Sequence, residues 1–296
     1  MNKASTMTMS SDFPVRFTPC LLAGLLLTAG VAVGVAQQNQ TAPEVEKIVR
    51  EASWNEMHSS GPPHYVRYRV SEQNPNGSSV KLVIQTKDGT VTRTIEKGGR
   101  PLSATDNDTE VARLKNLLAH PEIQLRRHKS ESQNSNREDE MVRMLPDAFL
   151  YTSEGMVPGP NGDCYRLSFR PNPSFVPPDR EGEVFHGMMG EAWIDQAQLR
   201  IVKIDAHLIS DVNFGWGVLG RLYRGGSMFE MNKDVGGPNA HHWESTELKL
   251  RLTGKILMVK SVDYSTTQTY TDFHLVPSDT TYQQAIQMLL SDPSAQ

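Results

Sequence analysis

Apolar and polar residues alternate along most of this chain, which is the pattern of half-buried strands. The first alternating segments cover 64–70, 80–86 and 90–96. Asn76-Gly77 and Asp88-Gly89 separate them and are typical of hairpin turns. Further strands are predicted at 147–153, 163–170, 190–195, 199–210, 226–232, 245–253 and 255–274, the last long enough for a bent strand or a strand pair. The pattern therefore predicts consecutive antiparallel strands.

Apolar residues recur at helical spacing in fewer places. We expect helices at about 43–57, where Thr41-Ala-Pro-Glu44 resembles a capping box, and at 109–119. Both are expected on the concave side of the sheet. Pro121 suits the first turn of a further helix, and Asp279 is a candidate cap for a C-terminal helix. The buried side of that last helix is predicted to hold Tyr282, Ile286, Leu289 and Leu290.

The apolar pattern breaks down between Arg126 and Glu140, where no strongly apolar residue occurs. Such a segment is either a solvated helical arm or a partly disordered connector, and the sequence leaves both open. This arm, near 121–145, marks a boundary between two halves of the predicted sheet. Because strands follow one another and helices stay apart from them, the predicted fold class is α+β, with a curved antiparallel sheet.

Residues 1–36 have the features of a secretory signal peptide. Lys3 and Arg16 are basic, and 20–36 is an uncharged run rich in Leu, Ala, Val and Gly. Small residues at Gly34 and Ala36 fit cleavage after Ala36. The run is too short to span a hydrocarbon core of about 30 Å comfortably. We therefore expect export to the periplasm, no permanent membrane span after cleavage, and a single mature domain over 37–296.

Charge and cysteine content narrow the function further. Loss of Lys3, Arg16 and Asp12 with the signal segment changes the formal net charge from −4 to −5. A chain without a strong basic field is not expected to bind nucleic acid. Cys164 is then the single cysteine and cannot form an internal disulfide. We interpret it as a strand residue, because a nucleophile would need a histidine partner that the sequence cannot place.

Two motifs invite a chemical interpretation. Residues 215–220, Gly-Trp-Gly-Val-Leu-Gly, match GxGxxG, but a dinucleotide site needs that loop between a strand and a helix, and no long helix follows. His241 and His242 with Glu244 suggest a metal, yet neighbouring strand residues point to opposite faces. The sequence contains no Gly-x-Ser-x-Gly elbow. We therefore predict no catalytic residue, no metal site and no cofactor.

The segment 171–190 holds four prolines, two phenylalanines and two methionines. The prolines exclude regular structure there and stiffen the loop. Its apolar side chains either cover an apolar cleft beside the sheet or pack on the domain's own core.

The residues Gly-Glu-Ala-Trp-Ile-Asp195, followed by a turn and Leu-Arg-Ile-Val-Lys-Ile-Asp205, predict a hairpin in which Asp195 forms the turn. This hairpin resembles that of the periplasmic lipoprotein-carrier superfamily, the LolA/LolB-like proteins. The motifs Pro-Asn-Pro and Gly-Met-Met-Gly look like those of exported bacterial proteins of uncharacterised function. The resemblance implies an incomplete antiparallel barrel wrapped over helices. It also implies an apolar interior that holds acyl chains, without catalysis or a cofactor.

We therefore predict a non-enzymatic exported protein that binds a lipid-like or lipoprotein acyl ligand in an apolar cleft. The alternative is an envelope structural or protein-interaction module with an envelope protein partner and no small-molecule ligand. If a ligand is bound, the uncharged strand faces that turn toward the helices are expected to contact it. Those predicted cavity residues are Tyr165, Leu167, Phe169, Val202, Ile204, Leu208, Leu248, Leu250 and Leu252.

Overall fold

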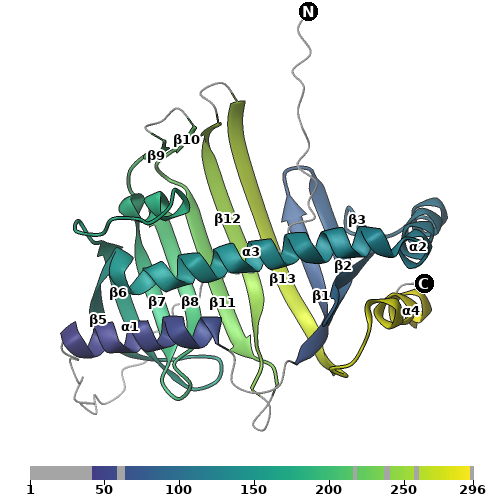
Figure 1. The fold of residues 1–296 in the computed structure, drawn as a ribbon, viewed down its shortest axis with the longest axis horizontal. Helices are drawn as coiled ribbons and strands as arrows, with labels where there is room; N and C mark the ends of the chain where they lie inside the picture. Colours follow the sequence, from purple (N-terminus) through teal and green to yellow (C-terminus); the bar gives the residue numbers. More distant parts are fainter. Residues whose placement is uncertain (1–41, 59–63, 216–218, 237–240, 257–259, 294–296) are drawn as a thin grey trace, which may run out of the picture.

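The computed structural model describes residues 42–58, 64–215, 219–236, 241–256 and 260–293, so the predicted signal segment lies outside the described residues. The described residues form a large sheet with helices along one face (Figure 1). The helices are α1 (Ala42–Met57), α2 (Ala104–Ala119), α3 (Pro121–Ala148) and α4 (Tyr282–Ser291), with the short 3-10 helix η1 (Glu181–Gly187). The strands are β1 (Tyr65–Asn74), β2 (Gly77–Thr86), β3 (Gly89–Lys97), β4 (Arg100–Pro101), β5 (Phe149–Pro158), β6 (Asp163–Pro171), β7 (Met188–Asp195), β8 (Ile201–Leu208), β9 (Val212–Phe214), β10 (Gly220–Leu222), β11 (Ser227–Asp234), β12 (Trp243–Ile256) and β13 (Lys260–Val276).

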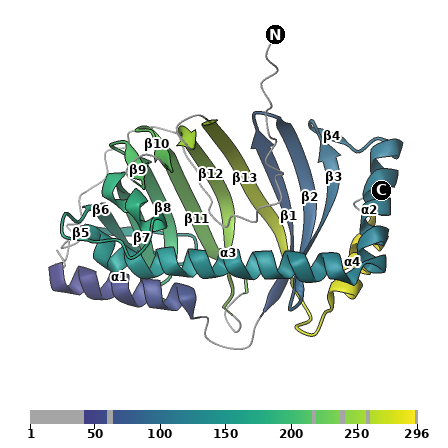
Figure 2. The same ribbon diagram turned by 45° about the horizontal axis from the view of Figure 1, so that its top comes forward.

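The strands pair in the order β4-β3-β2-β1-β13-β12-β11-β8-β7-β6-β5, with β9 and β10 as a short side hairpin beside β12. The pairs along this path are antiparallel. The two ends of the path, β4 and β5, are not neighbours, so the sheet is open. Figure 2 shows how it curves around α1 and α3. The predicted α+β class, with a curved antiparallel sheet over helices, is confirmed.

The polar arm is helical in the structure. It forms the middle of α3, which crosses the sheet from the β3 end to the β5 end (Figure 1). A helix of this length extends about 42 Å at about 1.5 Å per residue. The eleven strands of the main path, at a spacing of about 4.8 Å, are about 48 Å across. The single helix α3 therefore connects opposite edges of the sheet. It ends at Ala148, so β5 begins at Phe149 rather than at the predicted residue 147.

Apolar clusters pack the helices onto the sheet at both of its ends. At the β2 and β3 end, α2 and α4 cover a cluster that contains Ile84, Leu114 and Ile286, all at most 1% exposed. At the β5 end, α1 and the last turns of α3 cover two further clusters, which include Val49 and Phe149. The middle of α3 lies between these clusters, and this is where the candidate site lies.

Two helix caps differ from the sequence prediction. α2 begins at Ala104, earlier than the predicted range 109–119, because the Ser103 hydroxyl accepts a hydrogen bond from a backbone N–H of the first turn. α4 is capped by Thr281 and Gln284, whose side chains and backbone N–H groups bond reciprocally in a capping box. Asp279, the predicted cap, lies before this pair. The capping box satisfies two N–H groups rather than one, which favours the later start.

The predicted hairpin around Asp195 is confirmed. Asp195 Oδ1 accepts hydrogen bonds from the backbone N–H groups of Ala197 at 3.0 Å and Gln198 at 2.7 Å. Leu199, predicted to begin the second strand, instead belongs to the turn and has a φ of 47°. β8 therefore begins two residues later, at Ile201.

Candidate functional site

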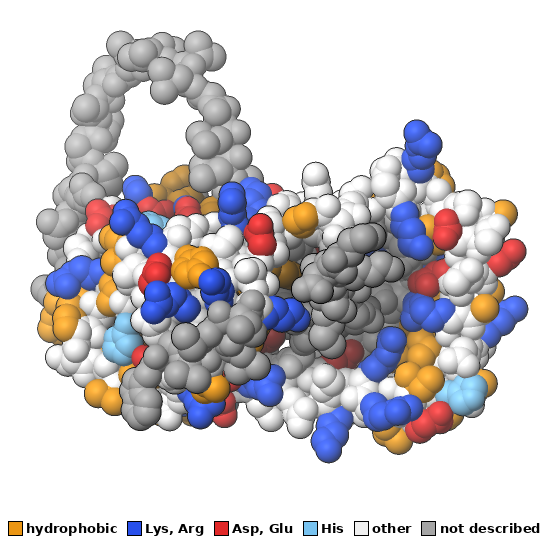
Figure 3. Space-filling model, turned by 90° about the horizontal axis from the view of Figure 1, so that it is seen from above, with side chains coloured by type: hydrophobic (Ala, Val, Ile, Leu, Met, Phe, Trp, Pro, Cys, Tyr) orange, Lys and Arg blue, Asp and Glu red, His pale blue; other side chains and the backbone are white. Residues whose placement is uncertain are grey.

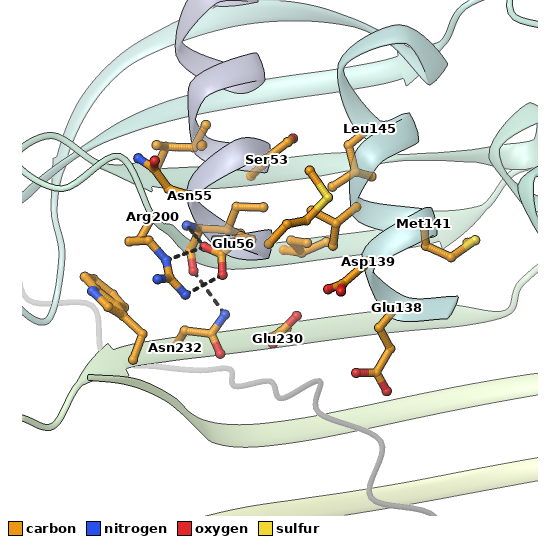
Figure 4. Close-up of a pocket in the computed structure, with 18 of the residues that line it drawn as sticks. Ser53, Asn55, Glu56, Glu138, Asp139, Met141, Leu145, Arg200, Glu230 and Asn232 are labelled. Carbon is orange, nitrogen blue, oxygen red and sulfur yellow. Dashed lines mark hydrogen bonds and ion pairs between the residues drawn. The ribbon is translucent and has the colours of Figure 1, made fainter. Parts of the chain in front are cut away.

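A cavity of about 1140 Å³ lies between the concave face of the sheet and the helices that cross it (Figure 4). α1 lines it from Val49 to Met57, followed by His58, and α3 lines it from Ser135 to Leu145. The opposite wall comes from β5, β6, β7, β8 and β11, together with η1 and the first residues of β12. The cavity exists because α3 carries its apolar residues at its ends, so its polar middle does not fill the space above the sheet.

One end of the cavity is aromatic. Phe149 lies with its ring centroid 4.7 Å from that of Phe169 and 5.2 Å from that of Phe185. Tyr151 pairs with Phe169 across β5 and β6, and its hydroxyl donates to the Leu145 carbonyl at 2.9 Å. Burial raises the pKa of this hydroxyl, and the nearby charge of Asp147 adds to the effect. The wall continues through Met141, Met188, Ala192, Ile194, Ile201 and Ile204.

An ion pair fixes the polar side of the cavity. The Arg200 guanidinium donates to both carboxylate oxygens of Glu56, at 3.0 and 2.7 Å. Glu56 also accepts from the backbone N–H of Ile201 at 2.7 Å. Asn55 donates to the Leu199 carbonyl at 3.2 Å. These bonds attach the last turn of α1 to the beginning of β8 and hold the cavity wall in place.

Glu230 is a buried carboxyl in the sheet wall, with only 5% of the residue exposed. It accepts a hydrogen bond from the Ser245 hydroxyl at 3.3 Å. Burial raises the pKa of Glu230 well above its ordinary value. The negative charges of Glu56 and Glu138 raise it further, while hydrogen bonds from Asn232 and Ser245 oppose the shift. Glu230 is therefore held more readily in its protonated form than an exposed glutamate.

Histidines gather near one rim of the cavity. His242 Nε2 lies 2.9 Å from Glu244 Oε1, and Glu244 also accepts from Gln85 at 3.0 Å. His241 bonds instead to Asp234, a different carboxylate. Within the described residues, no group of three or more His, Cys, Asp or Glu side chains is arranged to hold a metal ion. The pair of adjacent histidines thus divides between two carboxylates.

Two of the nine predicted cavity residues line the cavity: Phe169 and Ile204. Leu167 shares the face of Phe169 but lies in the cluster that α1 covers, with Tyr165 packed against that cluster. Leu208 pairs with Met188, so it lies on the concave face, though outside the cavity lining.

The predicted residues of β12 also face the concave side. Leu248 pairs with Glu230 and Leu250 pairs with Met228, and these two partners line the cavity. Residues directly opposite in an antiparallel pair project to the same face, and Leu252 follows by alternation. Leu248, Leu250 and Leu252 nevertheless lie outside the lining, farther along the strand.

Val202 lies at an irregularity in β8. Trp193 pairs with Lys203 and Ile194 pairs with Ile201, so Val202 has no partner on β7. This bulge shifts the alternation by one residue, and Ile201 lines the cavity rather than Val202. The sequence gives no signal for the bulge, because all residues from Ile201 to Ile204 except Lys203 are apolar.

Sequence reasoning missed the polar lining residues, including Glu56, Arg200 and Glu230. In β11 both faces mix apolar and polar residues, so alternation does not single out Glu230. Phe229 on the other face lies between two lysines, with Lys203 Nζ 5.3 Å and Lys249 Nζ 5.8 Å from the ring centroid. Met228 and Glu230 share one face of β11, but the sequence does not tell which face turns inward.

The remaining motifs have structural roles. Cys164 is fully buried in β6, and burial together with the charges of Asp195 and Asp163 raises its thiol pKa to about 12. In the GxGxxG segment, Gly215 directly follows β9 and Gly220 begins β10, and these two strands form a hairpin. Residues 216–218 lie outside the described residues. In the proline-rich loop, Phe175 packs on the β5-end core, while Phe185 packs there and also lines the cavity.

Comparisons with known proteins concern the fold. No family model and no curated protein matches the chain. Similar solved structures include an outer membrane lipoprotein-sorting protein domain from Vibrio parahaemolyticus, at 9% identity and TM-score 0.33, covering 79% of this chain and 93% of that chain. A LolA superfamily protein from Nitrosomonas europaea has 11% identity and TM-score 0.24, with 78% and 93% covered. A DUF1329 family protein from Desulfovibrio piger has 10% identity and TM-score 0.27, with 78% and 92% covered.

A protein of the superfamily that the hairpin around Asp195 resembles is thus among these similar structures. Within the described residues, no helix is both long enough and apolar enough to cross a membrane.

Proposed function

We propose that this protein is a non-enzymatic exported binding protein that holds the apolar chain of a lipid-like or lipoprotein acyl ligand in the cavity beneath α3. The observation that carries the proposal is the cavity itself, which has a volume of about 1140 Å³ and an aromatic inner wall. Ligand pockets commonly have volumes of about 300–1,000 Å³ and are lined mainly by apolar side chains with a few polar groups. This cavity is slightly larger than that range, and about half of its lining residues are apolar.

The energetics favour an extended chain over a compact polar ligand. Each buried methylene contributes about 0.8 kcal/mol, so a chain of about ten methylenes along the wall from Phe169 to Ile204 supplies the roughly 8 kcal/mol of micromolar binding, before the cost of association is subtracted. The single cysteine of the mature chain, the candidate nucleophile, does not suggest catalysis. Cys164 is buried as a thiol with a raised pKa, which makes it a poor nucleophile.

The location in the cell follows from the sequence, through the signal-like segment 1–36. We expect the mature chain to begin at Gln37 in the periplasm. N-terminal sequencing of the protein from the envelope of its host tests this. A cytoplasmic protein that retains residues 1–36 would contradict it.

The binding proposal is tested with N-phenyl-1-naphthylamine, an uncharged probe whose fluorescence rises in apolar surroundings. We expect saturable binding to the parent protein. Ala192 lines the cavity, so Ala192→Phe should fill the space, retain the fold and abolish binding. Ala206 lies on the same concave face at 1% exposure but does not line the cavity. Ala206→Phe should therefore act as overpacking and cost about 1–3 kcal/mol of stability.

Comparison of Ala192→Phe with Ala206→Phe distinguishes an open cavity from a packed core. If Ala192→Phe destabilises the protein as much as Ala206→Phe, and the parent binds no probe, the space beneath α3 is not a ligand site. That result would favour the alternative, an envelope structural or protein-interaction module with a protein partner.

A further inference from the structure

Two neighbouring hairpins expose apolar side chains at one end of the sheet. β9 and β10 form a side hairpin beside β12, and β12 continues into β13 through the next turn. Both turns lie at the end of the sheet that is drawn at the top of Figure 1. Leu219, directly before β10, is 37% exposed, and Ile256, the last residue of β12, is 45% exposed. Exposed apolar residues that gather in one place among polar neighbours mark sites of interaction.

Backbone pairing fixes basic residues beside these apolar ones. Gly220 pairs with Ile256, and Arg221 pairs with Lys255. Ile256 also pairs with Lys260 across the β12–β13 hairpin. Residues directly opposite in an antiparallel pair project to the same face. Lys260 therefore accompanies Ile256 on one face, and Arg221 accompanies Lys255 on the other. All of these side chains are exposed, and we call them, with Leu219, the hairpin-end surface: Leu219, Arg221, Lys255, Ile256 and Lys260.

The two hairpins are basic, although the chain as a whole is acidic. Residues 209–224 and 251–264 contain five basic and two acidic residues, a formal net charge of +3, whereas the whole chain has −4. Asp211 Oδ2 lies 3.8 Å from Arg221 Nη1. Among the described residues, no ion pair involves Lys255 or Lys260. Figure 3 looks onto this end of the molecule and shows both blue Lys and Arg side chains and orange apolar ones on its surface.

We infer that the hairpin-end surface docks on a membrane that carries anionic lipid headgroups. The two exposed apolar residues enter the headgroup layer, and the three basic residues meet the lipid phosphates. Buried apolar area and the attraction of basic side chains to anionic lipids both contribute to such binding. A net positive end on an acidic chain also orients the molecule toward an anionic surface.

The chemistry of the surface favours lipid over a protein partner. Lysine is depleted in protein interfaces, because its charge is strongly hydrated. At a membrane the long lysine side chain can bury its apolar stem and keep its ammonium at the level of the headgroups. Lys255 and Lys260 flank Ile256 closely, so burial of Ile256 in a protein interface would also remove these ammonium groups from water.

The test places a fluorophore at each end of the sheet. Ile256→Cys, labelled with nitrobenzoxadiazole, reports on the hairpin-end surface. Ala197→Cys, an exposed position in the β7–β8 turn, reports on the opposite end. Both are made in a Cys20→Ser background, and the buried Cys164 stays unlabelled. Both keep the rest of residues 1–36, so any membrane contact of that segment is common to them.

Vesicles of phosphatidylcholine alone are compared with an equal mixture of phosphatidylcholine and phosphatidylglycerol. We expect the label at position 256 to brighten with the mixed vesicles, at a lipid concentration at least about tenfold lower than with phosphatidylcholine alone. The label at position 197 should not respond. Added salt should weaken the response, because it screens exposed charges.

Charge variants of the Ile256→Cys reporter locate the attraction. Lys255→Gln/Lys260→Gln should raise the required concentration of mixed vesicles by at least about tenfold. Lys87→Gln/Lys233→Gln removes the same charge from exposed positions at the opposite end of the sheet and should leave it unchanged. Circular dichroism checks that each variant folds, and the contrast between the two labelled positions stands as a test without them.

Any of three results would overturn the inference: no response at position 256 to the mixed vesicles, an equal response at position 197, or an undiminished response in Lys255→Gln/Lys260→Gln. The first would leave the surface to a protein partner. The inference goes beyond the proposed function and fails separately from it, since the cavity probe needs no vesicles. A protein that binds N-phenyl-1-naphthylamine but no vesicles would keep the cavity proposal and lose this one.

Discussion

At the scale of single residues, Gly190 leaves less room for a Cβ atom than any other described glycine. A Cβ atom built at this position would lie 1.9 Å from the Asp205 carbonyl oxygen and 2.9 Å from the Ala206 Cα. Both atoms belong to the backbone of the adjacent strand, so a side-chain movement cannot relieve the contact. Only glycine allows β7 and β8 to pair here at their observed spacing.

We therefore expect Gly190→Ala to lose at least about 3 kcal/mol of stability, the upper end of typical overpacking costs. Urea denaturation measures this loss. Gly98→Asn is the control, because Gly98 has a φ of 61° and open space around it, and asparagine tolerates that conformation. A Gly190→Ala variant as stable as the parent would mean that β7 and β8 are not paired through these residues.

The buried carboxyl of Glu230 should make the stability of the folded protein depend on pH. Burial makes its pKa higher in the folded chain, so between the unfolded and the folded pKa the folded protein retains a proton that the unfolded chain has lost. This contribution to stability is fully present below the unfolded pKa of about 4.3 and declines as pH rises through the folded pKa. Glu230→Gln should therefore melt at a higher temperature than the parent at pH above neutrality, with the difference shrinking toward acidic pH. A difference that does not vary with pH would contradict the burial of an ionisable group.

Single residues also show where sequence reasoning stops. Alternation placed Phe169 and Ile204 on the concave face, and both line the cavity. Alternation failed at Val202, because a bulge depends on strand pairing rather than on residue type. The Glu56–Arg200 pair joins residues 144 positions apart, and no local pattern encodes such a contact. Contacts of that kind depend on how α1 docks on β8.

At the scale of elements, the position of α3 explains why its sequence fitted both a solvated helix and a disordered connector. Its middle has no apolar stripe because it faces solvent on one side and the cavity on the other. Its first half is attached to the β2–β3 hairpin. Gln124 donates to the Asp88 carbonyl in the turn, and Glu131 accepts from the N–H of Thr90 in β3 at 3.1 Å. Its end is buried through Met144 and Ala148. The helix is thus supported at its ends, which composition alone does not reveal.

This arrangement predicts uneven amide protection along α3. Hydrogen exchange followed by mass spectrometry should show faster exchange over 132–137 than over 141–147, because the middle has few buried contacts. A bound chain should slow exchange in the middle. Equal protection along the helix would mean that its centre is packed as firmly as its end, which would contradict the cavity beneath it.

At the scale of the whole molecule, one strand pair joins the two halves of the sheet. β1 pairs with β13 along most of its length, from Tyr65 with Val276 to Gln73 with Thr267. α3 joins the same halves on the concave side. The polar arm separates these two halves along the chain, as the sequence predicted, and the β1–β13 pair makes them one continuous sheet. The pairing of the first strand with the last is a non-local contact that sequence patterns do not show.

We expect the mature chain, residues 37–296, to unfold as one unit. Far-ultraviolet circular dichroism and tryptophan fluorescence should give coincident urea transitions. Trp193 and Trp243 report on the second half of the chain, whereas circular dichroism reports on both. Two separate transitions would show that the first meander and the later strands are independent domains.

The central claim is that an apolar chain occupies the cavity beneath α3, and contact between chain and lining tests it most directly. Met141, Met188 and Met228 line the cavity, while Met288 on α4 does not. In protein labelled with ¹³C at the methionine methyl groups, a dodecyl chain that carries a nitroxide at its end should broaden the NMR signals of the first three and leave Met288 sharp. Broadening of Met288 alone, or of no methionine at saturating probe, would contradict the account.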